Sequence, residues 1–152
     1  MSSLASPRLT TLLSADQHAR LMVCSRPVDL QEGTRLFEEG DPALRFWILR
    51  TGTVTLDVSV PGTRSAVIDT VNAGELLGWS WLFAPYRRHS GAEAMTRVRA
   101  YEFDAMAVRR MKNADPDLGS ALGQLVGQTL ARRLVSARVR LLDLYAPHGS
   151  GL

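Results

Sequence analysis

The chain has 152 residues, of which 45% are hydrophobic and 22% charged, and its 18 basic against 15 acidic residues give a formal net charge of +3. A chain of this length builds one domain and buries a sizeable core. The composition excludes disordered, collagen-like and coiled-coil chains. The basic excess is smaller than that of dedicated nucleic-acid domains, so charge alone indicates no partner.

The cysteine, histidine and hydropathy patterns exclude further classes. Cys24 is the one cysteine of the sequence; it is interpreted as a buried small residue, with a redox sensor as the alternative. There is no leader sequence and no apolar run near the ~20 residues of a membrane span, which predicts a cytoplasmic protein without membrane association. His18, His89 and His148 are far apart, so we expect no metal, no cofactor and no enzymatic activity.

The first predicted elements are a helix and a run of strands. Ser14 is a good N-cap and Asp16 places an acid in the first turn, which predicts a helix over 15–23. From Pro27 to Phe103, short runs of β-branched and aromatic residues are broken by glycine and proline turns. This spacing is typical of an antiparallel β-sandwich or barrel.

One predicted strand has a clear period of two. Its apolar positions are expected to face the core and its polar positions to face water; the former are Val54, Leu56, Val58 and Val60, the latter Thr53, Thr55, Asp57 and Ser59. A turn at Pro61-Gly62-Thr63 then predicts a hairpin into a strand over 66–71. Further strands are predicted over 36–38, 46–50, 92–95 and 98–103.

Two helices are predicted to follow. Asp104 is the N-cap of a short helix over 105–113, and Pro116 opens a long one that runs to about Tyr145. Steps of three and four place an apolar stripe along the long helix: Leu122, Val126, Leu130, Leu134, Ala137, Leu141 and Leu144. The stripe either lies on the chain's own sheet or forms the seam of a homodimer. Glycines at every fourth position (Gly119, Gly123, Gly127) destabilise a helix interior, which close backbone packing would compensate. We favour the homodimer, because the small sheet domain precedes this helix entirely.

The order of helix, short strands with glycine turns, short helix and long helix resembles the cyclic-nucleotide-binding domain of the catabolite-activator (Crp/Fnr) family of bacterial regulators. The resemblance spans 14–144 and rests on Glu39-Gly40-Asp41-Pro42, Phe46-Trp47-Ile48-Leu49, Gly52-Thr53-Val54, Val71-Asn72-Ala73-Gly74-Glu75-Leu76-Leu77-Gly78, Leu82-Phe83 and Ala131-Arg132-Arg133-Leu134. It implies a mainly β fold, a double-stranded β-helix or jelly roll over about 27–103, with an N-terminal helix and a dimer helix over about 116–145. The ends 1–13 and 146–152 are expected to be flexible.

The resemblance also implies a phosphate-binding cassette from Gly78 to about Ala94. In such a cassette a glycine admits the phosphate, free amides and an arginine bind it, and a carboxylate holds the ribose hydroxyl. Here Trp79 stands at the position of that carboxylate, and aligning Ser90 with the family's serine puts His89 at the position of the arginine. Arg87 and Arg88 precede it, so a one-residue loop shift would restore a cation.

Losing both charged groups would remove two contacts of roughly 1.5–3 kcal/mol each, so unmodified cyclic nucleotide is expected to bind weakly or not at all. If the segment is a strand end or turn, Trp79 and Trp81 point the same way. The two rings then either plug the interior or form a wall on which a flat ligand stacks, with Arg88 and His89 supplying charge. The candidate ligand-binding residues are Gly78, Trp79, Ser80, Trp81, Arg87, Arg88, His89 and Ser90.

The function predicted from these residues is a stand-alone regulatory or sensor domain that responds to an anionic or flat small molecule. The alternative is a ligand-free dimerisation or scaffolding module that docks a partner protein. Family members usually carry a helix-turn-helix domain after the dimer helix, and eight residues after Leu144 leave no room for one. The basic cluster of Arg132, Arg133, Arg138 and Arg140 is expected to solvate the sides of the helix seam, so no direct DNA binding is expected.

Overall fold

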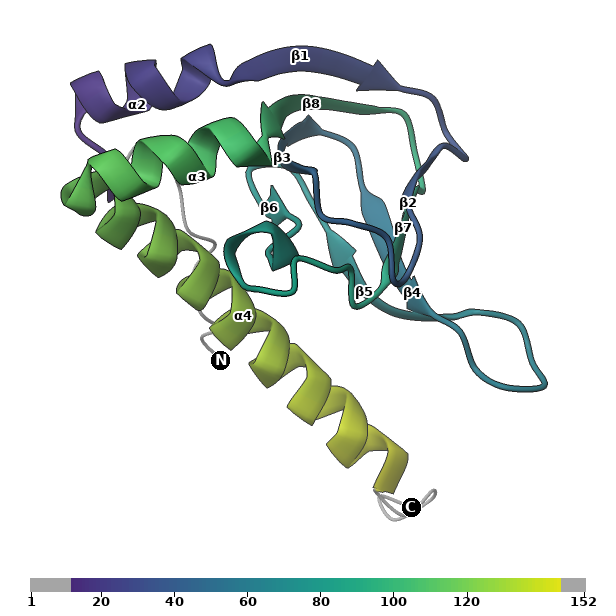
Figure 1. Ribbon diagram of the computed structural model, residues 1–152. Helices are drawn as coiled ribbons and strands as arrows, with labels where there is room; N and C mark the ends of the chain where they lie inside the picture. Colours follow the sequence, from purple (N-terminus) through teal and green to yellow (C-terminus); the bar gives the residue numbers. More distant parts are fainter. Residues whose placement is uncertain (1–11, 146–152) are drawn as a thin grey trace.

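The computed structural model describes residues 12–145, and Figure 1 shows helices α2, α3 and α4 together on one side of the strands. In chain order the elements are α2 (Ala15–Val23), β1 (Ser25–Leu30), β2 (Arg35–Phe37), β3 (Arg45–Thr51), β4 (Val54–Val58), β5 (Ala66–Val71), β6 (Leu76–Leu77), the 3-10 helix η1 (Ser80–Leu82), β7 (Gly91–Ala94), β8 (Val98–Asp104), α3 (Ala105–Ala114) and α4 (Pro116–Tyr145).

The strands form two four-stranded sheets with the orders β1-β8-β3-β6 and β2-β7-β4-β5. Every strand pair is antiparallel, and the predicted jelly roll with flanking helices is confirmed. The sequence indicated no separate strand at β1 or β6. β1 carries Pro27 and pairs only with β8, and such an edge position tolerates a residue without an amide donor.

The helix starts are those that the sequence predicts. The Ser14 hydroxyl accepts a hydrogen bond from the Gln17 amide at 3.1 Å, and Gln17 Oε1 accepts one from the Ser14 amide at 3.1 Å. The Asp104 carboxylate accepts hydrogen bonds from the amides of Met106 and Ala107 at 3.0 and 3.3 Å. These caps satisfy amides that have no partner inside their own helix.

Strand β4 departs from the predicted alternation. Val54 and Leu56 are buried as expected, but Asp57 is only 8% exposed and Val60 is 39% exposed. The pairing of β4 with β5 shifts register between Leu56 and Asp57, and the Asp57 carboxylate accepts hydrogen bonds from Arg35 at 2.6 and 3.2 Å. A bulge changes the facing of the residues beyond it, and Val60 lies beyond the end of β4 at Val58, so the prediction for Asp57 and Val60 was wrong.

Two apolar cores hold the fold together. One lies between the two sheets and includes Trp47, Leu56 and Val71. The other lies between the first sheet and the helices, where the Phe46 ring stacks on Trp81 at 4.3 Å and on Phe103 at 4.7 Å between ring centroids. Because Trp81 follows β6 and Phe103 ends β8, this stack links distant parts of the chain.

The predicted flexible ends lie mostly outside the described residues, which begin at residue 12 and end at residue 145. Two described residues fall inside the predicted N-terminal end. Leu13 is 7% exposed and belongs to the core under the helices, and Leu12 packs against the same core. This core therefore includes side chains that precede the N-cap of α2.

Helix α4 divides into a buried and an exposed half. Leu122 and Val126 are both 0% exposed in the core under the helices, whereas Leu134 is 70% and Leu141 52% exposed. In Figure 1 the C-terminal half of α4 extends past the strands. The placement of Leu122 and Val126 in a dimer seam was wrong, because these side chains are enclosed by their own domain.

Leu122→Ala is expected to lower the free energy of unfolding by about 2–5 kcal/mol, because it opens a cavity in the core under the helices. The matched control Leu44→Ala, at a side chain that is 53% exposed, is expected to change it by less than about 0.5 kcal/mol. Urea denaturation followed by circular dichroism measures both. Equal losses for the two variants would contradict the assignment of this core.

Candidate functional site

The loop between β6 and β7 brings most of the predicted ligand-binding residues to one place. In Figure 1 this loop, which carries η1, lies between the strands and α4. Six of the eight line a single small cavity, here called the inner cavity, together with residues of β2, β4 and α4; its lining is Phe37, Leu56, Gly78, Trp79, Ser80, Arg88, His89, Ser90 and Arg133. The predicted cassette thus forms a concave site.

Arg88 is the charged residue held deepest in this site. It is 5% exposed, its guanidinium lies over the Phe37 ring at 4.0 Å from the centroid, and its Nη2 donates to the carbonyl of Arg45 at 2.5 Å. Its Nε and Nη1 are buried and have no hydrogen-bond partner. Burial lowers the pKa of Arg88 to about 10, against an opposing effect of Asp41.

The arginine of the inner cavity is therefore Arg88 and not a residue replaced by His89. The sequence alignment placed His89 at the phosphate-binding position, and the structure places the His89 side chain on the exposed side of the loop. The one-residue shift that would restore a cation is the arrangement found here. The expectation that both charged groups are lost was wrong for the guanidinium.

Gly78 is required by the position of this guanidinium. Its φ is +94°, and a Cβ built on it would lie 2.8 Å from Arg88 Nη1. A side chain would be strained in this backbone conformation and would also displace the arginine. The glycine that the sequence analysis associated with phosphate access thus makes room for the cation of the site.

Trp79 and His89 stand side by side at the mouth of the inner cavity. Their rings stack with a centroid distance of 4.9 Å and an interplanar angle of 12°. Both residues also line a second, wider space here called the outer hollow, whose lining is Leu56, Ile68, Asp69, Trp79, His89, Ser90, Leu130, Arg133, Leu134 and Ala137. The stacked pair therefore stands between the two spaces.

The two spaces differ greatly in size. The inner cavity offers about 20 Å³, which is enough for about one water molecule. The outer hollow offers about 360 Å³ between β4, β5 and α4, which is within the range of small-molecule sites. A ligand group larger than water fits beside Arg88 only if residues that line the inner cavity, such as Trp79 and His89, move.

Trp81 and Arg87 do not belong to this site. Trp81 is 0% exposed and stacks on Phe46 in the core. The two tryptophans do not point the same way, because a 3-10 helix begins at Ser80 between them. Arg87 is exposed and forms an isolated β-bridge with Pro42. Trp81 has the structural role, and Trp79 alone faces the candidate ligand space.

Arg133 is a site residue that sequence reasoning assigned elsewhere. It lines both the inner cavity and the outer hollow, and its Nη2 donates to the carbonyl of Leu76 at 3.1 Å while its Nε is buried without a partner. Its pKa is lowered by burial, with Asp69 acting in the opposite direction. Its spacing from Leu130 and Ala137 in the stripe was the signal that could have placed it.

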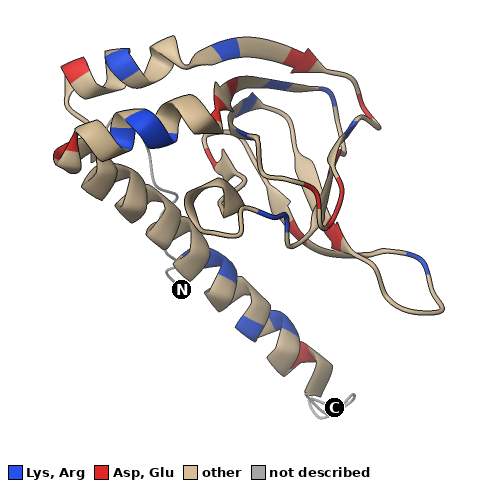
Figure 2. Cartoon of the chain, in the orientation of Figure 1, with Lys and Arg blue, Asp and Glu red and all other residues tan. Residues whose placement is uncertain are grey.

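The basic cluster on α4, visible as the blue segments of that helix in Figure 2, splits into two parts. Arg132 and Arg133 turn toward the barrel, where Arg132 Nη2 lies 3.4 Å from Glu75 Oε1. Arg138 and Arg140 are exposed. The expectation of a solvated cluster holds for the second pair and was wrong for the first.

The carboxylates nearest to this site lie outside the inner cavity. None of the described residues that line it is an aspartate or glutamate. Glu75 accepts a hydrogen bond from the Asn72 amide at 2.8 Å and pairs with Arg132, and Asp69 lines only the outer hollow. The inner cavity therefore combines two guanidinium groups with no acidic side chain.

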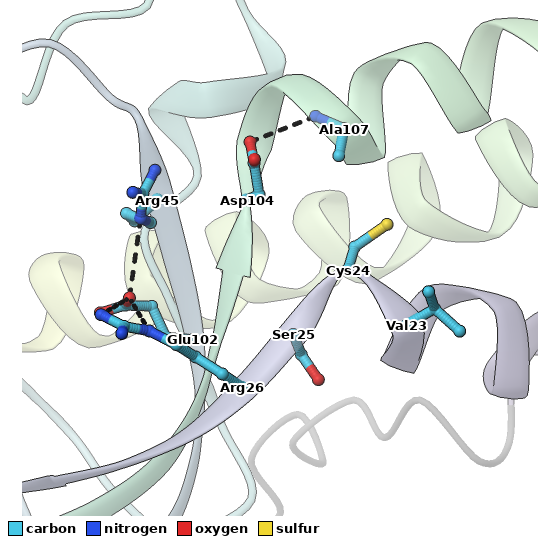
Figure 3. Close-up of a pocket in the computed structure, with 8 residues that line it drawn as sticks. All are labelled: Val23, Cys24, Ser25, Arg26, Arg45, Glu102, Asp104 and Ala107. Carbon is cyan, nitrogen blue, oxygen red and sulfur yellow. Dashed lines mark hydrogen bonds and ion pairs between the residues drawn. The ribbon is translucent and has the colours of Figure 1, made fainter.

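A third hollow lies between α2, β1 and α3 and is shown in Figure 3. It measures about 570 Å³ and contains Cys24, whose pKa is raised by burial and by Asp104. Its other charges are paired: Glu102 lies 2.9 Å from Arg26 and 3.6 Å from Arg45. A thiol with a raised pKa is a weak nucleophile, and the Asp104 carboxylate of the lining caps α3 through the amides of Met106 and Ala107.

Metal ligands and membrane spans can be considered for the described part of the chain. No group of three or more histidine, cysteine, aspartate or glutamate residues within 12–145 lies close enough to hold a metal ion. Among the helices of those residues, none is long and apolar enough to cross a bilayer.

Comparison with known proteins identifies the family of the domain that carries this site. The family model "Cyclic nucleotide-binding domain" matches residues 27–115. The chain is 31% identical over 119 residues to the CRP-like cAMP-activated global transcriptional regulator of Mycobacterium tuberculosis, which covers 78% of this chain and 51% of that protein. The chain thus spans about half the length of the curated relatives it matches.

Solved structures have the same architecture. The N-terminal domain of a transcriptional regulator from Streptomyces coelicolor is 29% identical, with a TM-score of 0.69 over 87% of this chain and 94% of that one. A cyclic nucleotide-binding domain from Methylobacillus flagellatus, at 20% identity, has a TM-score of 0.78 over 89% and 76% of the two chains, which shows the fold. With its jelly roll, its cassette loop and its long final helix, this chain belongs to the cyclic nucleotide-binding domain family and has relatives among the CRP-like bacterial regulators.

Proposed function

We propose that this domain is a sensor in which Arg88 binds an anionic group of a small ligand, and that it does not bind cyclic AMP in the usual way. The observation that carries the proposal is the buried guanidinium, with two N–H groups that lack a partner. A buried charge without compensation is costly. An anion in the inner cavity would supply both the missing charge and the missing acceptors.

The absence of a carboxylate from the lining of the inner cavity, within the described residues, argues against the usual ligand. A ribose hydroxyl would find Trp79 where the family carries an acid. The contact that is lost is worth roughly 1.5–3 kcal/mol, which is about a ten- to hundredfold loss of affinity. Because Arg88 is present, this is one lost contact rather than two.

The stacked rings of Trp79 and His89 connect ligand binding to α4. A ligand that reaches Arg88 must part this pair, and its remaining atoms would then lie in the outer hollow against Leu130 and Leu134 of α4. A ligand shifts a conformational equilibrium when it contacts one state better than the other. The signal would therefore be a change in the position of α4.

The second candidate function is a ligand-free scaffold that docks a partner protein. Its support is the size of the inner cavity, about 20 Å³, which the Trp79–His89 pair leaves closed. In this function the domain keeps the family fold, the pair is a permanent plug and Arg88 has a structural role. A binding domain of this family performs no chemistry, so both candidates are non-enzymes.

We also propose that the domain forms a homodimer through the exposed face of α4, revised from the stripe expected from the sequence. This face joins small residues near the middle of the helix to large apolar residues near its end: Gly123, Gly127, Ala131, Leu134, Val135, Leu142 and Tyr145. Nothing lies within 4 Å of a Cβ built on Gly123 or Gly127, which leaves space for the backbone of a second helix.

Inorganic phosphate is expected to raise the melting temperature of the wild-type domain by several degrees at millimolar concentration, because it binds the folded state alone. The control is sodium chloride at matched ionic strength, which is expected to have no comparable effect. Differential scanning fluorimetry measures both. In calorimetric titrations, saturable micromolar binding of cyclic AMP would overturn the claim that the usual ligand is lost.

Arg88→Met is expected to abolish the effect of phosphate and to raise the free energy of unfolding of the ligand-free domain by about 1–4 kcal/mol, because an apolar side chain replaces an uncompensated buried charge. The control Arg87→Met removes the neighbouring, exposed charge and is expected to change stability by less than about 0.5 kcal/mol. A loss of stability in Arg88→Met, with phosphate binding retained, would favour the structural role.

Leu142→Asp is expected to weaken dimerisation at least tenfold, because it places a charge in the proposed apolar seam. Met106→Asp, at an apolar residue of α3 that is 52% exposed against 62% for Leu142, is the control and is expected to leave the dimer intact. Sedimentation velocity over a range of protein concentrations gives both dissociation constants. A monomeric wild-type domain at all concentrations would refute the homodimer.

A further inference from the structure

The inner cavity is lined by cations that come from two different parts of the fold. Arg88 comes from the loop before β7, and Arg133 comes from the middle of α4. Each has a single hydrogen bond to a backbone carbonyl, to Arg45 and to Leu76 respectively. Each also has a buried N–H group without a partner: Nε and Nη1 of Arg88, and Nε of Arg133.

The charges around the two cations are unequally distributed. Asp69 faces the outer hollow and not the inner cavity, and its Oδ1 accepts a hydrogen bond from the Thr70 amide at 2.8 Å. Glu75 pairs with Arg132. Asp69 and Glu75 act on Arg133, and Asp41 acts on Arg88, from outside the inner cavity. Since no described carboxylate lines the cavity itself, one negative charge placed there would be shared by two guanidinium groups.

Resting on the function proposed above, we infer that the ligand is a phosphate monoester of a flat heterocycle, of the nucleoside monophosphate class, whose doubly charged phosphate is shared by Arg88 and Arg133. A cyclic phosphodiester carries one negative charge, whereas a monoester carries up to two. Two guanidinium groups are suited to several oxygens of one phosphate. The site would therefore select its ligand by the charge of the phosphate group.

The outer hollow suits the remainder of such a ligand. Its apolar lining includes Leu56, Ile68 and Leu130, and the Trp79 ring supplies a flat face on which a heterocycle can stack. Asp69 provides an acceptor for an amino or hydroxyl group at the same place. The negatively charged phosphate would therefore lie in the inner cavity, and the uncharged ring in the outer hollow.

Phosphate binding would also loosen a tie between α4 and the barrel. Arg133 Nη2 now donates to the Leu76 carbonyl at 3.1 Å. A phosphate oxygen is a stronger acceptor than a neutral carbonyl, so the ligand would compete for this N–H. The neighbouring pair of Arg132 and Glu75 would stay in place, which lets the helix turn about that contact without leaving the barrel.

Calorimetric titration at pH 8, where the monoester is fully charged, tests the inference with adenosine and guanosine 5′-monophosphates, cyclic AMP, cyclic GMP, adenosine and inorganic phosphate. One of the two monophosphates is expected to bind at least tenfold more tightly than its cyclic counterpart, and adenosine is expected not to bind. Arg133→Gln is expected to reduce this preference to less than threefold. Arg138→Gln, an exposed arginine of the same helix, is expected to leave it unchanged.

The outcomes separate the two proposals. Inorganic phosphate and nucleotides could bind through Arg88 without any preference for the monoester, or with a preference that Arg133→Gln retains. Either result would overturn the inference but would still support the proposed anion sensor. If no anion binds at all, both proposals fail. Arg133→Lys keeps the charge and is expected to retain a preference above threefold, which distinguishes a role in binding from damage to the fold.

Discussion

The burial of one positive charge is the constraint on which the rest of this site depends. Arg88 is enclosed by aromatic rings and held by a single carbonyl, with two N–H groups left without a partner. Gly78 must lack a side chain to admit it. Desolvating the charge opposes stability, and the contacts of the guanidinium with the rings of Phe37 and Trp47 offset part of that cost. In the proposed function, the anion of a ligand would supply further compensation.

The long helix joins this site to the surface of the domain. Its first half is part of the core, through Leu122 and Val126, and its middle reaches the barrel through Arg132 and Arg133. Its last turns expose apolar side chains, and Arg140 there lies 4.0 Å from Asp69 of β5. One continuous element thus contacts the inner cavity, the outer hollow and the proposed seam. A change at Arg133 would be carried to that seam by a rigid body rather than by a series of loosely coupled side chains.

The family fold and the family site are separable in this chain. The core contains a ring stack of Trp81, Phe46 and Phe103, none of which lines the inner cavity or the outer hollow. The two sheets pair as in other jelly rolls. Trp79, two residues before Trp81, lies in the candidate ligand space. Aromatic residues so close together serve different purposes because a 3-10 helix sends their side chains in different directions. Substitution at the ligand-facing position leaves the core unchanged, which is how a binding fold acquires new ligands.

The sequence by itself determined the helix starts at Ser14 and Asp104, the hairpin after β4, and the run of strands, because caps, turns and alternation are local properties. It also placed Gly78, Trp79, Arg88 and His89 in one loop. Only the tertiary structure decided which cation enters the cavity, since a one-residue shift in a loop leaves no trace in composition or spacing. It likewise decided that Asp57 is buried beyond a bulge, that Leu122 belongs to the core, and that Arg133 faces the site. Each of these depends on a partner element elsewhere in the chain; for Arg133 the spacing from Leu130 and Ala137 gives the face of the helix, but not the element that this face contacts.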